Sequence, residues 1–405
     1  MSTMERLLRL MADKRASDLF LTPGSPVQLK VNGITVPINQ QRLEPPHVIG
    51  LIREVVGDRQ WEIFETDHEL NVGYGVRDVG SFRINVFRQR GTPAAVVRFI
   101  PGDIPTLDAL GLPPILGELV MEKRGLLLVV GSTGSGKSTT LASMIDLRAE
   151  KRSGHILTME DPIEFTFRHK RSIVNQRQIG TDTKSLQIGL KNAMRQAPDC
   201  ILIGEIRDTE TMTMALAYAQ SGHLVLATLH ANNANHALNR IIGFYSPDNR
   251  RVLLSDLAAA LKGVVSQRLI RAREGDQRLP AVEILLNTRH VAELIETGRL
   301  TEIKEAMEKS LAPGSVTFDQ ALARLVRENR IAREDALAHA DSPTNLLWNL
   351  ENAGDEAPSA AASGATMMPE LQVPPTPGAD ADPAQPGRPK PPGDSASFSE
   401  FLLNV

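Results

Sequence analysis

The apolar residues of the N-terminal region follow two periodicities. Residues 4–11 carry apolar side chains at helical spacing, which predicts a helix with one face in a core. In GSFRINVFRQR, residues 80–90, apolar and polar side chains alternate, which predicts a half-buried strand. We predict a small N-terminal α+β domain over residues 1–100, then a proline-broken linker over 101–114.

The pattern changes after residue 115. Four apolar runs, LLLVV, HILTM, CILIG and HLVLATL, alternate with helical segments, which is typical of parallel strands buried on both faces. We therefore predict an α/β core with a parallel sheet over residues 115–275. Residues 276–350 carry helical spacing and are expected to form a C-terminal helical region.

Residues 351–405 are rich in proline and alanine and should be disordered. The last residues regain one apolar face with Phe398, Phe401 and Leu402. Two interpretations of this end remain open. It forms a short docking helix for a partner, or it is an unbound terminus.

The segment GSTGSGKS, residues 131–138, matches the phosphate-loop pattern G-x-x-x-x-G-K-[ST] between a strand and a helix. Its glycines let backbone N–H groups point at phosphate oxygens. In such a loop the lysine neutralises the β- and γ-phosphates, and the serine hydroxyl binds Mg²⁺. We predict a nucleotide-binding site formed by Gly131, Ser132, Thr133, Gly134, Ser135, Gly136, Lys137, Ser138 and Thr139.

Carboxylates and histidines stand at the ends of three later apolar runs. Parallel strands bring such groups to one edge of a sheet, so we expect them to face the phosphates. Taken singly, a carboxylate at a strand end is more often a solvated cap or a salt-bridge partner. The three histidines could suggest a metal trio, but neutral rings satisfied by the backbone are the commoner case. The candidates are Glu160, Asp161, Glu164, Glu205, His223, His230 and His236.

Composition narrows the class of protein. The chain has 405 residues, a formal net charge of −3 and no run of basic residues, which disfavours a nucleic-acid translocase. Its single cysteine, Cys200, excludes an internal disulfide and a four-cysteine zinc element. No apolar stretch approaches the roughly 20 residues of a membrane span, and the N-terminus is no signal peptide. We expect a cytoplasmic protein.

Several ordered motifs resemble one family. GSTGSGKSTTLASM, EDPIEF, LKNAMRQAPDCILIGEIRD and SGHLVLATLHANNANHALNRIIGF together are similar to the secretion and pilus-motor ATPases, in the type IV pilus retraction branch of the RecA-like superfamily. The resemblance runs from about residue 1 to 345. It implies a PAS-like α+β N-terminal domain, a RecA-like P-loop ATPase core with a parallel sheet, and the hydrolysis of ATP with Mg²⁺.

The resemblance also implies roles for single residues. Glu164 would be the general base, with Glu160 as the second candidate. Glu205 would be the Walker B carboxylate near the metal, together with Ser138. His230 would sense the γ-phosphate, supported by His223. Arginines of the N-terminal domain would reach a nucleotide bound to a neighbouring subunit. Arg83 and Arg98 match the usual places and Arg90 is a further candidate, although a plain surface role is as compatible with the sequence.

The family further implies partners and a place in the cell. We expect a homo-hexamer that works with a retraction ATPase of the PilT type. It would dock on an inner-membrane platform protein of the PilC type, at the inner face of the cytoplasmic membrane. The leading hypothesis is a motor for pilus retraction. The alternative is a nucleotide-dependent regulatory subunit with little hydrolysis of its own.

Overall fold

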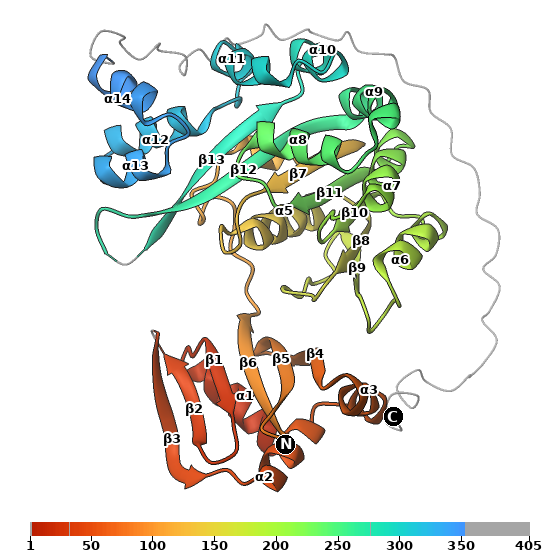
Figure 1. The fold of residues 1–405 in the computed structure, drawn as a ribbon, viewed down its shortest axis with the longest axis vertical. Coiled ribbons are helices and arrows are strands. Elements are labelled where there is room, and N and C mark those ends of the chain that lie inside the picture. Colours follow the sequence, from red (N-terminus) through yellow and green to blue (C-terminus); the bar gives the residue numbers. More distant parts are fainter. Residues whose placement is uncertain (1, 32, 276, 353–405) are drawn as a thin grey trace, which may run out of the picture. The chain divides into compact units, whose positions relative to one another are not determined.

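The computed structural model describes residues 2–352, apart from residues 32 and 276 (Figure 1). The first two residues of the predicted tail, Glu351 and Asn352, end a helix, whereas the rest of it, with Phe398, Phe401 and Leu402, lies outside the described residues. None of the described helices is long and apolar enough to cross a membrane.

The N-terminal domain is a six-stranded antiparallel sheet with three helices. Neighbouring strands follow the order β3-β2-β1-β6-β5-β4. Helix α1 begins after Ser2, whose hydroxyl accepts a hydrogen bond from the N–H of Glu5 at 3.1 Å. Met4 and Met11 of this helix are fully buried, which confirms the predicted apolar face. The elements are α1 (Thr3–Asp13), β1 (Asp18–Leu21), β2 (Pro26–Val31), β3 (Ile34–Arg42), α2 (Pro45–Arg53), α3 (Asp58–Asp67), β4 (Glu69–Val76), β5 (Gly80–Gln89) and β6 (Thr92–Pro101).

The second domain is built on a seven-stranded sheet in the order β13-β12-β7-β11-β10-β8-β9. The predicted apolar runs form its central strands, which pair in parallel, and β13 pairs antiparallel with β12. The sheet therefore extends past residue 275, into the region where the sequence pattern placed helices. The strands are β7 (Gly125–Val130), β8 (Gly154–Glu160), β9 (Ser172–Gln178), β10 (Cys200–Ile203), β11 (Leu224–Leu229), β12 (Leu261–Arg271) and β13 (Arg278–Leu286).

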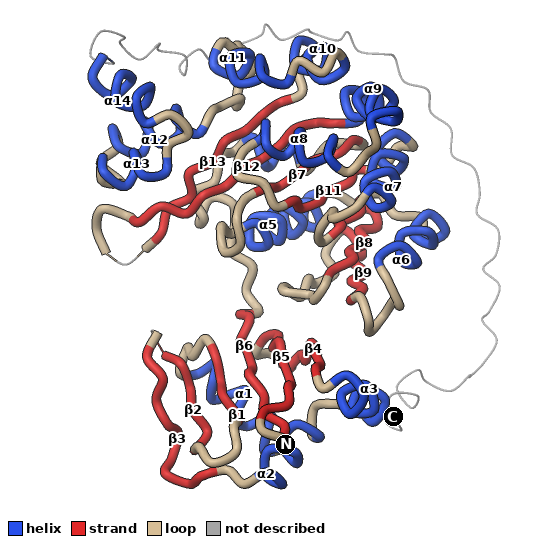
Figure 2. Tube along the Cα trace, viewed as in Figure 1, coloured by secondary structure: helices blue, strands red, loops and turns tan. Residues whose placement is uncertain are grey.

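Helices cover both faces of this sheet (Figure 2). In β7, Leu127 and Val129 pack toward α5, whereas Leu126 and Leu128 belong to the apolar cluster on the other face. This explains why the strand sequence is apolar without alternation. One face carries α4 (Ile115–Leu119) and α5 (Lys137–Lys151). The other carries α6 (Leu186–Ala193), α7 (Thr209–Gln220), α8 (Ala234–Gly243), α9 (Arg250–Ala260), α10 (Arg289–Glu296) and α11 (Ile303–Glu308).

Three C-terminal helices pack against the distal part of β12 and β13 (Figure 1). Phe318 and Leu322 of the first helix contact Ile270 of β12 and Ala281 of β13 in one buried cluster. The helices are α12 (Phe318–Arg327), α13 (Arg333–His339) and α14 (Pro343–Asn352). Short 3-10 helices are η1 (Met194–Gln196), η2 (Pro247–Asn249) and η3 (Leu300–Glu302).

Candidate active site

The phosphate loop lies between β7 and α5, as the sequence predicts. Gly136 has φ of 90°, a conformation that side chains with a Cβ rarely adopt. A Cβ on Gly131 would lie 2.6 Å from the backbone carbonyl of Gln267, so no larger residue fits there. Thr140 on α5 donates to the buried Gln267 side chain at 2.7 Å, which fastens the start of the helix to β12. The loop is therefore held from behind by β12.

The lysine of this loop folds back over its backbone. Lys137 Nζ donates to the carbonyls of Gly131 at 2.9 Å and Ser132 at 2.8 Å. Burial lowers the pKa of Lys137, while the charges of Glu205 and Glu164 oppose that shift. The hydroxyl of Ser135 is buried and has no hydrogen-bond partner among the described residues. The loop thus presents a half-buried cation and an unpaired donor, which suits phosphate oxygens.

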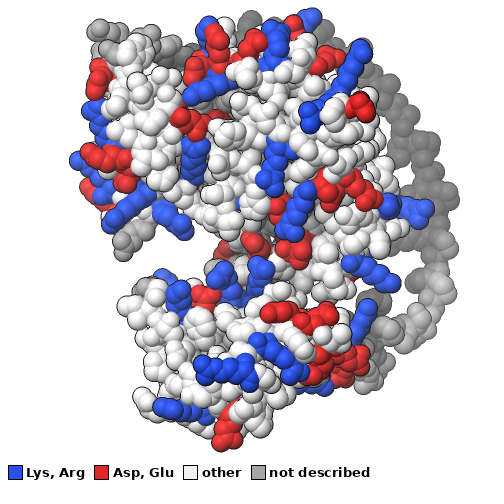
Figure 3. Space-filling model, in the orientation of Figure 1, with Lys and Arg blue, Asp and Glu red and all other residues white. Residues whose placement is uncertain are grey.

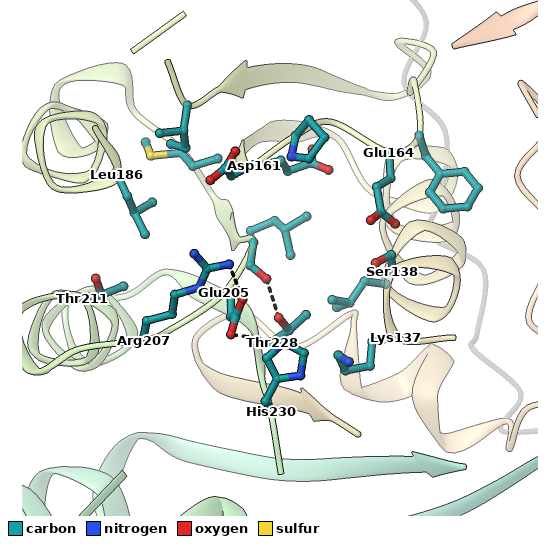
Figure 4. A pocket seen from close by; sticks show the side chains of 18 of the residues that line it. Lys137, Ser138, Asp161, Glu164, Leu186, Glu205, Arg207, Thr211, Thr228 and His230 are labelled. Atoms are coloured by element: carbon teal, nitrogen blue, oxygen red, sulfur yellow. Dashed lines mark hydrogen bonds and ion pairs between the residues drawn. The ribbon is translucent and has the colours of Figure 1, made fainter. Parts of the chain in front are cut away.

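Glu205 directly follows β10 and is contacted from two sides. One carboxylate oxygen, Oε2, accepts from Arg207 Nη2 at 2.7 Å, and the other, Oε1, lies 3.4 Å from His230 Nε2 (Figure 4). Thr228 on β11 donates to the carbonyl of Gly204 at 2.5 Å, which ties the ends of β10 and β11 together. The predicted Glu205 and His230 are therefore brought together at the carboxyl edge of the sheet.

The two glutamates of the segment after β8 differ in their surroundings. Glu160 is largely buried, and its Oε1 accepts from Thr158 at 2.7 Å and from Gln176 at 3.2 Å. Burial raises the pKa of Glu160, and the hydrogen bonds from Thr158, Gln176 and the backbone of Glu164 oppose this shift. Glu164 instead lies opposite Ser138 at the phosphate loop (Figure 4). Glu160 is thus engaged in holding the segment that carries Glu164.

These groups line one cavity of about 640 Å³, within the size range of small-molecule sites. Lys137, Ser138, Glu160, Glu164, Glu205 and His230 all contribute to its wall. A smaller hollow of about 310 Å³ adjoins the phosphate loop and is lined by His230, His236 and Arg240, among others.

Other predicted residues lie in different places. Arg83 on β5 lines the cavity. Its cross-strand neighbour Arg98 forms an ion pair with Asp18 of β1 at 3.0 Å, and Arg90 lies in the turn that follows β5. His223 precedes β11, at the strand end opposite His230, and contacts Tyr218 and Ser221. His223 is therefore not brought to the phosphate loop.

Sequence reasoning did not single out Arg207. The available signal was its position two residues after Glu205, within GEIRD. At this spacing, where the chain leaves a strand, a long basic side chain can reach back to the carboxylate. The described residues contain no cluster of three or more His, Cys, Asp or Glu side chains that could hold a metal ion. A histidine trio is thus not a metal site. The hydroxyl of Ser138 and the carboxylate of Glu205 are oxygen donors of the type Mg²⁺ prefers, and Mg²⁺ usually takes its remaining ligands from phosphates and water.

On the face shown in Figure 3, acidic and basic side chains are interspersed over the described surface. No large patch of a single sign stands out on this face of the described residues.

Comparison with known proteins gives consistent matches. The family model "Type II/IV secretion system protein" matches residues 5–335. The "Type IV pilus ATPase PilU" of Pseudomonas aeruginosa is 45% identical over 94% of this chain and 98% of its own length. The "Type IV pilus retractation ATPase PilT" of the same organism is 38% identical over 84% of this chain and 98% of its own. Among solved structures, "Crystal Structure of the Pilus Retraction Motor PilT and Bound ADP" has a TM-score of 0.80 and 38% identity, covering 86% of this chain and 99% of that one.

Proposed function

Because the chain belongs to the type II/IV secretion system protein family, in the group that contains PilU and PilT, we propose that it is a motor ATPase for type IV pilus retraction. In this proposal the energy of ATP hydrolysis drives the motor. The observation that carries the proposal is the convergence of Lys137, Glu164, Glu205 and His230 on one cavity at the phosphate loop.

The arrangement assigns a task to each side chain. The loop and the N-terminus of α5 bind the phosphates, and Lys137 exchanges its two backbone carbonyls for phosphate oxygens. Glu164 takes a proton from the attacking water, and Glu160 holds its backbone. Glu205 and Ser138 would hold Mg²⁺, which supplies charge neutralisation on the phosphates when bound. His230, beside Glu205, is placed to contact the γ-phosphate.

We further propose that six copies of this chain form a ring. Arg83 lines the cavity of its own chain, and in the proposed ring it instead supplies positive charge in trans to the nucleotide of a neighbouring subunit. The pair between Arg98 and Asp18 favours Arg83 as the arginine donor, because Arg98 already has a carboxylate partner.

The chain is more similar in sequence to PilU, at 45% identity, than to PilT, at 38% identity. We propose an accessory motor that works together with a PilT-type ATPase on a PilC-type platform protein, at the inner face of the cytoplasmic membrane. ATP is its substrate and Mg²⁺ its cofactor.

The experiment is a retraction assay in four strains: wild type, one that lacks this chain, one that lacks the PilT-type ATPase and one that lacks both. Each deletion strain is complemented with wild-type protein or with Lys137→Ala. We expect Lys137→Ala to fail wherever wild-type protein restores force. Full restoration by Lys137→Ala would instead support the regulatory subunit, and no effect of any deletion of this chain would contradict a role in retraction.

A further inference from the structure

The segment that carries His230 is fastened from outside the nucleotide cavity. It runs from the end of β11 to the start of α8. The carbonyl of Asn232 accepts from Arg268 Nη2 at 3.0 Å. The Asn233 side chain donates to Asp341 Oδ2 at 3.0 Å, and the N–H of Ala234 donates to Glu283 Oε1 at 2.6 Å. Three consecutive residues are thus each held by a different part of the chain.

Arg268 on β12 is the centre of this arrangement. Its guanidinium pairs with Asp341 Oδ1 at 2.6 Å and also donates to the carbonyl of His339. It lies over the ring of Phe318, 3.8 Å from the centroid. The side chains of Arg268 and Asp341 are only 19% and 18% exposed, so their attraction is less screened than that of a surface pair. A guanidinium with contacts on several sides has little freedom to move.

Asp341 is in turn fixed by the C-terminal helices. Its backbone N–H donates to Asp319 Oδ1 of α12 at 3.0 Å. The other oxygen of the buried Asp319 accepts from Lys304 of α11 at 3.0 Å. The position of Asp341 therefore depends on how α11 and α12 pack, and not on the nucleotide cavity.

We infer that Arg268 and Asp341 are positioning residues, which hold Asn232 and Asn233, shortly after His230, so that His230 meets Glu205 at the reacting phosphate. The C-terminal helices thereby set the geometry of the γ-phosphate contact from behind the site. This inference rests on the proposed role of His230. Neither residue lines the nucleotide cavity, so neither acts on the phosphates directly.

The test uses full-length protein and four variants. Asp341→Ala removes the partner of both Arg268 and Asn233. Asn233→Ser is a milder change, because serine still caps α8 but no longer reaches Asp341. Arg333→Gln is the control: it breaks the 2.7 Å ion pair with Glu351 between α13 and α14 and touches no residue of the His230 segment. His230→Ala provides the background for double variants.

We expect Asp341→Ala to lower kcat for ATP hydrolysis about 10–100-fold, with KM near wild type, because the misplaced group acts in the transition state. Asn233→Ser should lower kcat in the same direction, and it decides the question if Asp341→Ala does not fold. Arg333→Gln should leave kcat unchanged. In the His230→Ala background, Asp341→Ala and Asn233→Ser should cause no further loss of phosphate release.

Three results would overturn the inference. The first is that Asp341→Ala lowers kcat by the same factor in wild-type protein and in the His230→Ala background, which would mean that Asp341 acts by another route. The second is an unchanged kcat in both Asp341→Ala and Asn233→Ser. The third is an unchanged kcat in His230→Ala itself. Only this third result also contradicts the proposed role of His230, so the two failures can be told apart.

Discussion

Glu283 should make the stability of the ATPase core fall as pH rises toward neutrality. Its side chain is buried between β12 and the start of α8, where it accepts from Ser266 at 3.0 Å and from the N–H of Ala234. Burial raises the pKa of Glu283 from 4.5 to about 7; the hydrogen bonds and Arg268 oppose this shift, and Asp341 adds to it.

The sign follows from proton binding. Between pH 4.5 and 7 the folded state binds this proton more tightly than the unfolded state does. The extra stability is complete below pH 4.5 and is lost as pH rises through 7. A shift of this size corresponds to about 3 kcal/mol, at 1.36 kcal/mol per pKa unit. Glu283→Gln removes the titration and keeps an oxygen acceptor for Ala234 and Ser266.

The assay is calorimetric unfolding of wild type, Glu283→Gln and the exposed control Glu296→Gln at pH 5 and pH 8. The Tm of Glu283→Gln minus the Tm of wild type should be about 6–12 °C larger at pH 8 than at pH 5. Glu296→Gln should show no such shift. A difference in Tm that is the same at both pH values would refute the reasoning.

Three further predictions concern the site and its support. Glu164→Gln should bind ATP but lower kcat about 10²–10⁴-fold, whereas Glu160→Gln should be milder; the reverse order would assign the base to Glu160. Gly131→Ala should abolish nucleotide binding measured by calorimetry, because its Cβ would lie 2.6 Å from a β12 carbonyl. The control Gly243→Ala should bind normally, because its Cβ would have nothing within 4 Å. Arg148→Met should lower stability by about 1–3 kcal/mol, since it leaves two carbonyls after α4 unpaired; a raised Tm would contradict this.

Much of the fold could be predicted from local sequence patterns. The strand before the phosphate loop, the loop and the helix after it are contiguous in sequence, so their apolar run and glycine spacing predict them directly. The alternating residues 80–90 likewise form β5 with buried Phe82 and Ile84. The strand β13 was not recognised, because its membership of the sheet depends on its pairing with β12.

Residues of the site that depend on distant contacts could not be predicted. Arg268 reaches Asp341 across 73 positions of the chain, and no spacing rule links such residues. The partner of Arg98 is Asp18, 80 residues away, and this ion pair decides which of two similar arginines remains without a carboxylate partner in the structure. His223 is the opposite case: it stands in the same apolar run as His230, but the length of β11 separates them.

The central claim is that the phosphate-loop cavity hydrolyses ATP, and steady-state phosphate release by the purified full-length chain tests it most directly. Wild-type protein and Lys137→Ala are compared at matched concentration, with folding checked by Tm. The account predicts turnover by wild type and a loss of more than about tenfold in Lys137→Ala, because the variant lacks the cation for the β- and γ-phosphates. Equal turnover by the two proteins, with the fold intact, would contradict it.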